Sequence, residues 1–184
     1  MKTKIGGKNA LYPSLTVLVG ANVGGKANFA TVAHVGIATM KLITLGMAKN
    51  RYTTSGIKEN KTFSVNIPSS KVVAETDYCG MVSGQNTDKS TLFKVFYGEL
   101  KTAPMIMECA VNMECKLHDI IEFPTHDLVV GEPFETYVDE SALTDGAIDI
   151  TKVDPLLFEM ASKKYWSIGG AVANCWSVGK ELKK

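Results

Sequence analysis

The segment from Lys49 to Ser55 carries the side chains best suited to binding a phosphate group. Cations and hydroxyls follow directly on an apolar run, at Lys49, Arg51, Thr53, Thr54 and Ser55. A guanidinium, hydroxyls and backbone N–H groups at the start of a turn are the donors that a phosphomonoester needs. The alternative is a solvated basic loop before a capped helix from Gly56 to Asn60. The residues alone do not decide between these two interpretations.

A second segment, from Gly20 to Ala27, comes close to the phosphate-loop motif of nucleotide triphosphatases. It matches G-x-x-x-x-G-K and follows an apolar strand, as that motif should. The next position must supply a magnesium-binding hydroxyl, however, and here it is Ala27. Residues 27–39 favour a strand with a bulge over the helix that the motif requires, although a poor helix is conceivable. We therefore expect a glycine-rich hairpin between two strands.

Two further groups of residues offer chemistry. A loop of small residues from Cys79 to Gly84 leads to Asp88 and Lys89, and its lack of bulk could let the backbone approach a ligand. On its composition alone, this segment is an ordinary loop with no assigned function. The chain has three histidines: His34, His118 and His126. We choose His126 as the catalytic candidate, because it starts an apolar strand and strand ends line barrel mouths.

The four cysteines indicate neither a metal site nor a disulfide framework. They form no C-x-x-C pair, and no second ligand pair accompanies Cys115 and His118. Alternating apolar residues predict one strand from Met105 to Leu117, on which Cys109 and Cys115 would lie roughly 20 Å apart at about 3.3 Å per residue. We expect buried free thiols, no metal and a reducing compartment.

Length and composition indicate one folded domain over residues 1–184. The chain is 45% hydrophobic and 21% charged, and 20 Lys and Arg against 19 Asp and Glu give a formal net charge of +1. Balanced charge gives no general attraction to nucleic acid or anionic membranes. From Asn9 to Ala48 only Lys26 and Lys41 are charged, but the uncharged runs are too short and polar to span a membrane. We expect a cytoplasmic protein without nucleic-acid or membrane partners.

The hydrophobic pattern predicts a mainly β fold with α insertions. Short apolar or alternating runs indicate strands at residues 15–19, 42–46, 62–67 and 128–138. Ser69 and Ser70 offer N-caps for a short helix ended by Gly80. Asp154 followed by Pro155 predicts another helix, to about Ser162. Many short strands with two or three helices favour a barrel over a βαβ sheet.

Taken in order, these segments resemble the flavin reductase family with the FMN-binding split-barrel fold, and specifically its flavoredoxin-like branch. His126 to Glu132 matches the family's His-x-x-x-x-Gly-Glu. Other similar segments are the opening Tyr12-Pro13, the small-residue segment 26–33, the phosphate loop 51–53 with strand 60–68, the aspartate-to-lysine loop 77–89 and the aromatic segment 165–170. The resemblance covers most of the chain, although each motif alone is weak.

The resemblance implies an FMN held in a groove between two subunits of a homodimer. By position, the flavin ring would contact Asn28, Ala30 and Thr31, and the phosphate would contact Lys49, Arg51 and Thr53. Ser83 and Lys89 would reach in from the next loop, Lys89 toward the N1–C2 edge of the ring, and His126 would lie on the nicotinamide or acceptor side. The other cofactor-binding candidates are Val32, Met47, Ala48, Tyr52 and Trp166.

Two departures from the family pattern bear on the activity. His34 stands where flavoredoxin-like relatives usually carry Trp, and residues 39–42 replace the usual Pro-Pro turn. The resemblance implies a flavoprotein that takes a hydride from NAD(P)H, as a flavin or ferric reductase, or electrons from a protein donor, as a carrier. The alternative is a non-redox split-barrel module that binds another small ligand.

Overall fold

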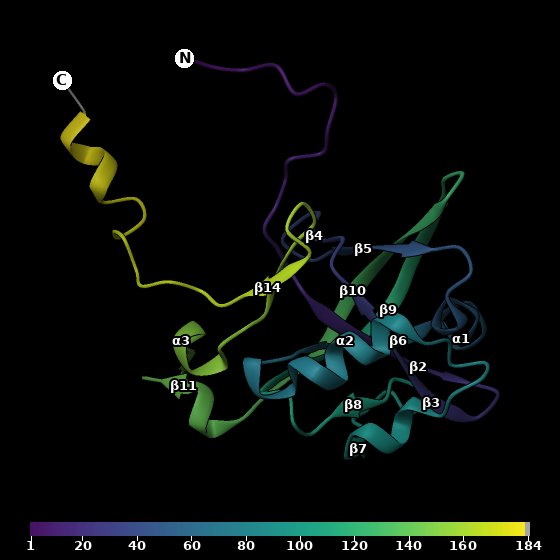
Figure 1. Ribbon diagram of the computed structural model, residues 1–184. Coiled ribbons are helices and arrows are strands. Elements are labelled where there is room, and N and C mark those ends of the chain that lie inside the picture. The colour runs from purple at the N-terminus through teal and green to yellow at the C-terminus, as the bar shows by residue number, and fades with distance from the viewer. Residues whose placement is uncertain (183–184) are drawn as a thin grey trace.

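The main element of the fold is a seven-stranded antiparallel sheet. The computed structural model describes residues 1–182, and the strands follow the order β3-β2-β6-β9-β10-β5-β4 (Figure 1). Their bounds are β2 Val17–Val23, β3 Lys26–Val32, β4 Val35–Ile37, β5 Ile43–Ala48, β6 Thr62–Ile67, β9 Val111–Glu122 and β10 His126–Val138. The mainly β fold with α insertions is therefore confirmed.

One hydrophobic core joins strands from both halves of this sheet. Val19 on β2, Ala30 on β3, Leu45 on β5, Phe63 on β6 and Val129 on β10 are each buried within a single cluster. Strands that are distant in the order of the sheet share this core, so the sheet curls around it as a partly closed barrel.

Smaller elements surround the barrel. Short strands form three further sheets: β1 Ser14–Leu15 with β13 Leu157–Glu159 and β14 Lys164–Trp166, β7 Val95–Phe96 with β8 Met105–Ile106, and β11 Leu143–Thr144 with β12 Ala147–Ile148. The helices are α1 Tyr52–Asn60, α2 Val73–Met81, α3 Ile150–Val153 and the 3-10 turns η1 Ser70–Val72, η2 Lys89–Leu92, η3 Glu140–Ala142 and η4 Val178–Leu182. None of the described helices has the length and hydropathy needed to cross a membrane.

The glycine-rich hairpin is confirmed. Gly24 and Gly25 have φ of 57° and 79°, and they join β2 to β3 with Val23 paired to Lys26. Two successive positive φ angles are typical of the tight turn that matches strand twist, and glycine adopts them without steric cost. Ala27 lies in a strand, so the phosphate-loop interpretation of this segment is wrong.

Local capping explains where the helices differ from prediction. Ser69 caps η1 by accepting the N–H of Lys71, as predicted, but α2 continues through Gly80 to Met81. Helix α1 begins at Tyr52 rather than Gly56. The helix predicted after Asp154 is wrong. The Asp149 carboxylate accepts the Thr151 N–H and starts α3 upstream, Asp154 ends that helix at φ 51°, and β13 follows.

The single strand predicted from Met105 to Leu117 is also wrong, because the chain turns between β8 and β9. Buried amides favour this turn: the Asn66 Oδ1 atom accepts the N–H of Ile106 at 3.0 Å and an Asn112 amide proton at 2.8 Å. Asn112 also donates to the Ile106 carbonyl at 2.9 Å. Cys109 and Cys115 are nevertheless buried free thiols, as expected, and they lie in different clusters.

Replacing Gly56 by Ala should destabilise the fold, although alanine favours helices more than glycine does. A β-carbon at Gly56 would lie 2.1 Å from the carbonyl oxygen of Asn22, so α1 would have to move off β2. We expect a loss of about 1–3 kcal/mol in the free energy of unfolding, measured by urea denaturation. Gly80→Ala is the control, since its β-carbon would meet Thr31 at an ordinary 3.4 Å. Equal losses in the two variants would contradict this packing.

Candidate functional site

Two adjoining cavities meet where β5 leads into α1. Ala48 and Arg51 line both of them. The first cavity, of about 230 Å³, also contacts β3, β10 and the β13–β14 sheet. The second, of about 310 Å³, extends to the loop after α2. Strand β5 and the first turn of α1 therefore position the shared wall.

The first cavity has the walls that a flat, mainly apolar ring needs. Small residues form part of its lining, at Ala33, Gly46, Ala48 and Gly80. Larger side chains stand around them, at His34, Met47, His126, Phe158 and Tyr165. An apolar cleft with a few polar groups at its edge is typical of a cofactor or ligand site.

The two histidines at this cavity face one another. The ring centroids of His34 and His126 are 5.6 Å apart and the rings are tilted by 54°. The hydroxyl of Tyr12 lies 3.2 Å from the His34 Nε2 atom, and the Thr125 hydroxyl lies 3.0 Å from the His126 Nδ1 atom. Two imidazole rings therefore stand together at this wall, and their nitrogens can hydrogen-bond a group in the cavity.

The second cavity has the donors of an anion site. Helix α1 starts at Arg51 without a side-chain cap and has no acidic residue in its first turn. Its first N–H groups and the positive end of its dipole are therefore available to an anion. The hydroxyls of Thr53 and Ser83 and the cationic side chains of Arg51 and Lys89 line the same space. Arg51 is the only arginine of the chain.

The two cations are held by backbone carbonyls of α2 and of the loop after it. The Arg51 guanidinium donates to the Gly80 carbonyl at 3.0 Å. Lys89 is 3% exposed, and its ammonium donates to the carbonyls of Cys79 and Val82, both at 3.1 Å. Burial lowers the pKa of Lys89, and the Arg51 charge acts in the same direction. An ammonium has three protons, so one donor of Lys89 remains for a ligand.

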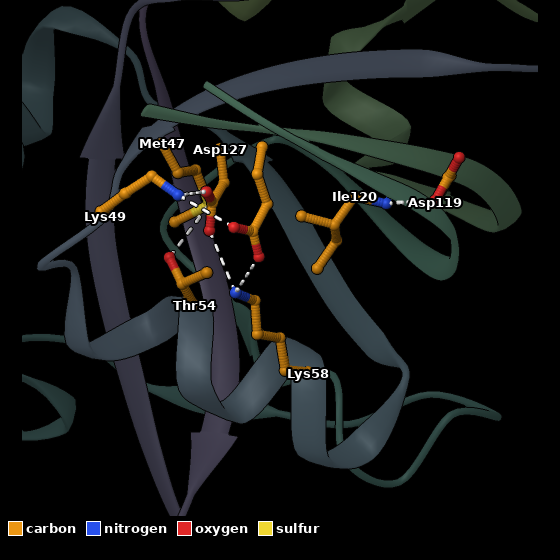
Figure 2. A network of polar contacts seen from close by, with 8 residues as sticks. Met47, Lys49, Thr54, Lys58, Asp119, Ile120 and Asp127 are labelled. Atoms are coloured by element: carbon orange, nitrogen blue, oxygen red, sulfur yellow. Dashed lines mark hydrogen bonds and ion pairs between the residues drawn. The ribbon is translucent and has the colours of Figure 1, made fainter. Parts of the chain in front are cut away.

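An ion-pair network behind this wall fixes the end of β5 (Figure 2). The Asp127 carboxylate, 3% exposed, pairs with Lys49 at 3.0 Å and with Lys58 of α1 at 3.1 Å. Glu122 on β9 reaches the same two ammonium groups at 3.2 and 3.8 Å. Burial opposes ionisation of Asp127, but hydrogen bonds from both lysines outweigh it and hold its pKa below the usual value. The network thus connects β5, α1, β9 and β10.

Most of the predicted site residues line these cavities. The first cavity contains Thr31, Val32, Met47, Ala48, Arg51 and His126, and the second contains Ala30, Ala48, Arg51, Tyr52, Thr53, Ser83 and Lys89. Asn28 lines a third cavity next to the second, and its amide donates to the Thr53 hydroxyl at 2.6 Å. In the described part of the chain, Lys49 and Trp166 line none of these walls. Lys49 instead pairs with Asp127, and a cofactor contact of either residue stays a prediction.

Sequence reasoning missed the aromatic wall of the first cavity. Phe158 and Tyr165 line it, and the Tyr165 hydroxyl donates to the Asp77 carboxylate at 2.9 Å. Burial, followed by this hydrogen bond, raises the pKa of Tyr165 to about 12. Neighbouring residues of a strand point to opposite faces, so Tyr165 rather than Trp166 faces the cavity. The sequence shows the aromatic pair Tyr165-Trp166, but it does not reveal which of the two side chains faces the cavity.

Comparison with known proteins identifies the class. The family model of the flavin reductase like domain matches residues 9–167, so the chain belongs to this family. Flavoredoxin from Methanosarcina acetivorans is 46% identical with a TM-score of 0.94, covering 99% of both chains. Flavoredoxin of Desulfovibrio vulgaris (Miyazaki F) is 34% identical with a TM-score of 0.92, covering 97% of this chain and 100% of that one.

These similarities confirm the split-barrel fold and the flavoredoxin branch of the family. An uncharacterized protein of Archaeoglobus fulgidus is also 34% identical over 145 residues, which cover 76% of this chain and 80% of that protein. The family and the flavoredoxin similarities support a flavin-related, oxidoreductase-like protein with a flavin cofactor.

The Asp127 network should make stability depend on pH on the acid side. The folded-state pKa of Asp127 is lowered, so its ionisation stabilises the fold above about pH 4 and the contribution is lost as pH falls below the folded pKa. Asp127→Asn should lower the free energy of unfolding by about 1 kcal/mol at pH 7 and by less at pH 3. Urea denaturation at the two pH values measures the difference. Asp119→Asn, at an exposed carboxylate, is the control. A pH-independent loss would contradict the network.

Proposed function

We propose that this protein binds FMN and passes electrons through it, with the flavin ring in the first cavity and the phosphate in the second. The observation that carries the proposal is the uncapped start of α1, where Arg51 and Lys89 flank an anion site. That site opens beside an apolar cavity whose lining includes small residues. A single molecule with a flat ring and a terminal phosphate would fill the apolar first cavity and the anion site of the second cavity.

The donor set fits a phosphate. Hydroxyls, backbone N–H groups and two cations surround the second cavity, and its described lining contains no carboxylate. Backbone carbonyls hold the two cations, but the Arg51 charge still opposes that of Lys89. A phosphomonoester carries about −1.5 to −2 charges at neutral pH and would neutralise them.

When bound, FMN would supply hydride or single-electron transfer, and the protein would supply position and charge. Arg51 and Thr53 would bind the phosphate, while the remaining N–H of Lys89 would stabilise negative charge in the site. His126 and His34 would offer ring nitrogens for hydrogen bonds at the cavity wall. Phe158 and Tyr165 would exclude water from the outer edge of the ring.

We infer that the active form is a homodimer. Large apolar side chains are exposed around β4, including Leu11 at 86%, Ile37 at 84% and Met40 at 100%. A fourth cavity lined by Leu11 and Val35 shares Ala33, His34 and Gly46 with the first. A second copy seated on this face would cover the apolar surface and close the ring site, which an exposed patch of this kind favours.

Two versions of this function are open, and they differ in the electron donor. A reductase would take a hydride from NAD(P)H, whereas a carrier would take electrons from a protein. We place either version in the cytoplasm, because three of the cysteines are buried free thiols. A non-redox module for another small ligand is the alternative, and the yellow absorbance of bound flavin in the purified protein would exclude it.

Arg51→Ala should raise the dissociation constant for FMN at least tenfold, because it removes a charge-assisted contact to the phosphate. Quenching of flavin fluorescence on titration measures the effect, with Lys94→Ala as an exposed control outside the cavities. Riboflavin lacks the phosphate, so its affinity should fall less than that of FMN, even though Arg51 also borders the ring cavity. An equal loss for riboflavin and FMN would show that Arg51 does not bind the phosphate.

His126→Ala should slow reduction of the bound flavin by its donor about tenfold or more, since it removes the imidazole that lines the first cavity beside His34. Stopped-flow absorbance with NADH, NADPH and a reduced protein donor measures the rate and shows which donor works. His118→Ala is the matched control, because His118 is exposed and lies outside both cavities. The affinity for FMN should stay within threefold; unchanged rates in His126→Ala would contradict its role.

A further inference from the structure

Thr16 connects the short strand β1 to the barrel strand β2. Its backbone N–H donates to the Leu156 carbonyl at 2.8 Å, which fixes its position. Its side chain is fully buried, and it lines the first cavity. Thr16 lies outside every segment through which the chain resembles the flavin reductase family, so the resemblance gives it no role.

The Thr16 hydroxyl has no hydrogen-bond partner within the described residues 1–182. A buried hydroxyl without a partner costs free energy, and buried polar groups in proteins are nearly always hydrogen-bonded. A partner atom that comes from a ligand would remove this cost. The hydroxyl therefore marks a point at the first cavity where a ligand atom that accepts or donates a hydrogen bond would be stabilised.

The other polar side chains of the first cavity already have partners. Each of them makes a hydrogen bond within the chain: Thr31 with Thr76, His34 with Tyr12, Arg51 with Gly80, His126 with Thr125 and Tyr165 with Asp77. These contacts hold the walls of the cavity in place. Thr16 differs from them because the whole hydrogen-bonding capacity of its side chain is unused within the described chain.

The strands beside Thr16 supply apolar walls. Leu15, which precedes it, pairs with Leu157 of β13, and Val17, which follows it, pairs with Val32 of β3. These two partner strands contribute Phe158 and Val32 to the lining of the first cavity. A hydrogen bond in apolar surroundings is stronger than one in water. A flat ring with one polar and one apolar edge would therefore be favoured in the orientation that turns its polar edge to Thr16.

We propose that the Thr16 hydroxyl hydrogen-bonds the polar edge of the flavin ring, the edge with two carbonyl oxygens and a ring N–H, and so orients the ring in the first cavity. This inference rests on the proposed flavin site. It adds a contact to the ring, whereas Arg51 would bind the phosphate at the other end of the cofactor.

The test compares Thr16→Val with Thr16→Ser in the full-length protein. Valine removes the unpaired hydroxyl, so Thr16→Val should raise the midpoint of thermal unfolding of the cofactor-free protein by about 2–4 °C. It should weaken binding of FMN by about three- to tenfold, measured by quenching of flavin fluorescence. Lumiflavin, which lacks the ribityl phosphate, should be weakened by the same factor. Thr16→Ser keeps the hydroxyl and should bind both flavins within twofold of the wild-type protein.

Thr76→Val is the matched control. Thr76 is buried as fully as Thr16, but its hydroxyl donates to the Val72 carbonyl at 2.7 Å. It is not among the described residues that line the first two cavities. Its replacement should lower the midpoint of thermal unfolding and leave both flavin affinities within twofold.

The remaining outcomes separate this inference from the proposed function. A wild-type protein that binds no FMN would refute the flavin site itself. Normal FMN binding with an unchanged affinity in Thr16→Val would refute the Thr16 contact alone. A loss for FMN without a loss for lumiflavin would place the hydroxyl against the ribityl chain and overturn the ring assignment. A lower midpoint of unfolding in cofactor-free Thr16→Val would show that the hydroxyl has a partner without the flavin, which would also overturn the proposal.

Discussion

The buried carboxylate of Asp127 is the constraint on which the site depends. A charge at 3% exposure stays ionised only while other charges face it, and Lys49 and Lys58 supply them from the end of β5 and from α1. This pairing fixes the turn between the strand and the helix. Arg51 and the first N–H groups of α1 lie within that turn, so the geometry of both cavities follows from a network that lines neither of them.

The site cations also hold the protein together. Arg51 and Lys89 donate to three carbonyls of residues 79–82, which bind the loop after α2 to the start of α1. Each cation keeps donors in excess of these contacts. The same groups therefore position the second cavity and remain able to bind an anion within it. The glycine at position 84 contributes to this arrangement, because a β-carbon at Gly84 would lie 2.0 Å from the Asn28 side-chain oxygen.

Local patterns predicted much of the fold and of the site. Alternation predicted β6, and the glycines predicted the hairpin between β2 and β3. The rest depends on contacts that local patterns do not reveal. The sequence indicates a helix cap at Asp154, but the Asp149 carboxylate, five residues earlier, caps α3. The pairing of Lys49 with Asp127 requires β5 and β10 to lie side by side. Whether Tyr165 or Trp166 faces the first cavity depends on the register of β14 against β13.

The uncapped start of α1 would make the stability of the chain depend on the anion that binds there. The Arg51 charge lowers the pKa of Lys89, so a bound anion would relieve the repulsion between these two cations. A ligand that binds only the folded state shifts the unfolding equilibrium in proportion to its concentration over its dissociation constant. Molecules that lack their cofactor would open first and reach cellular proteases first. Cofactor loading would in this way act as a quality-control step for the chain.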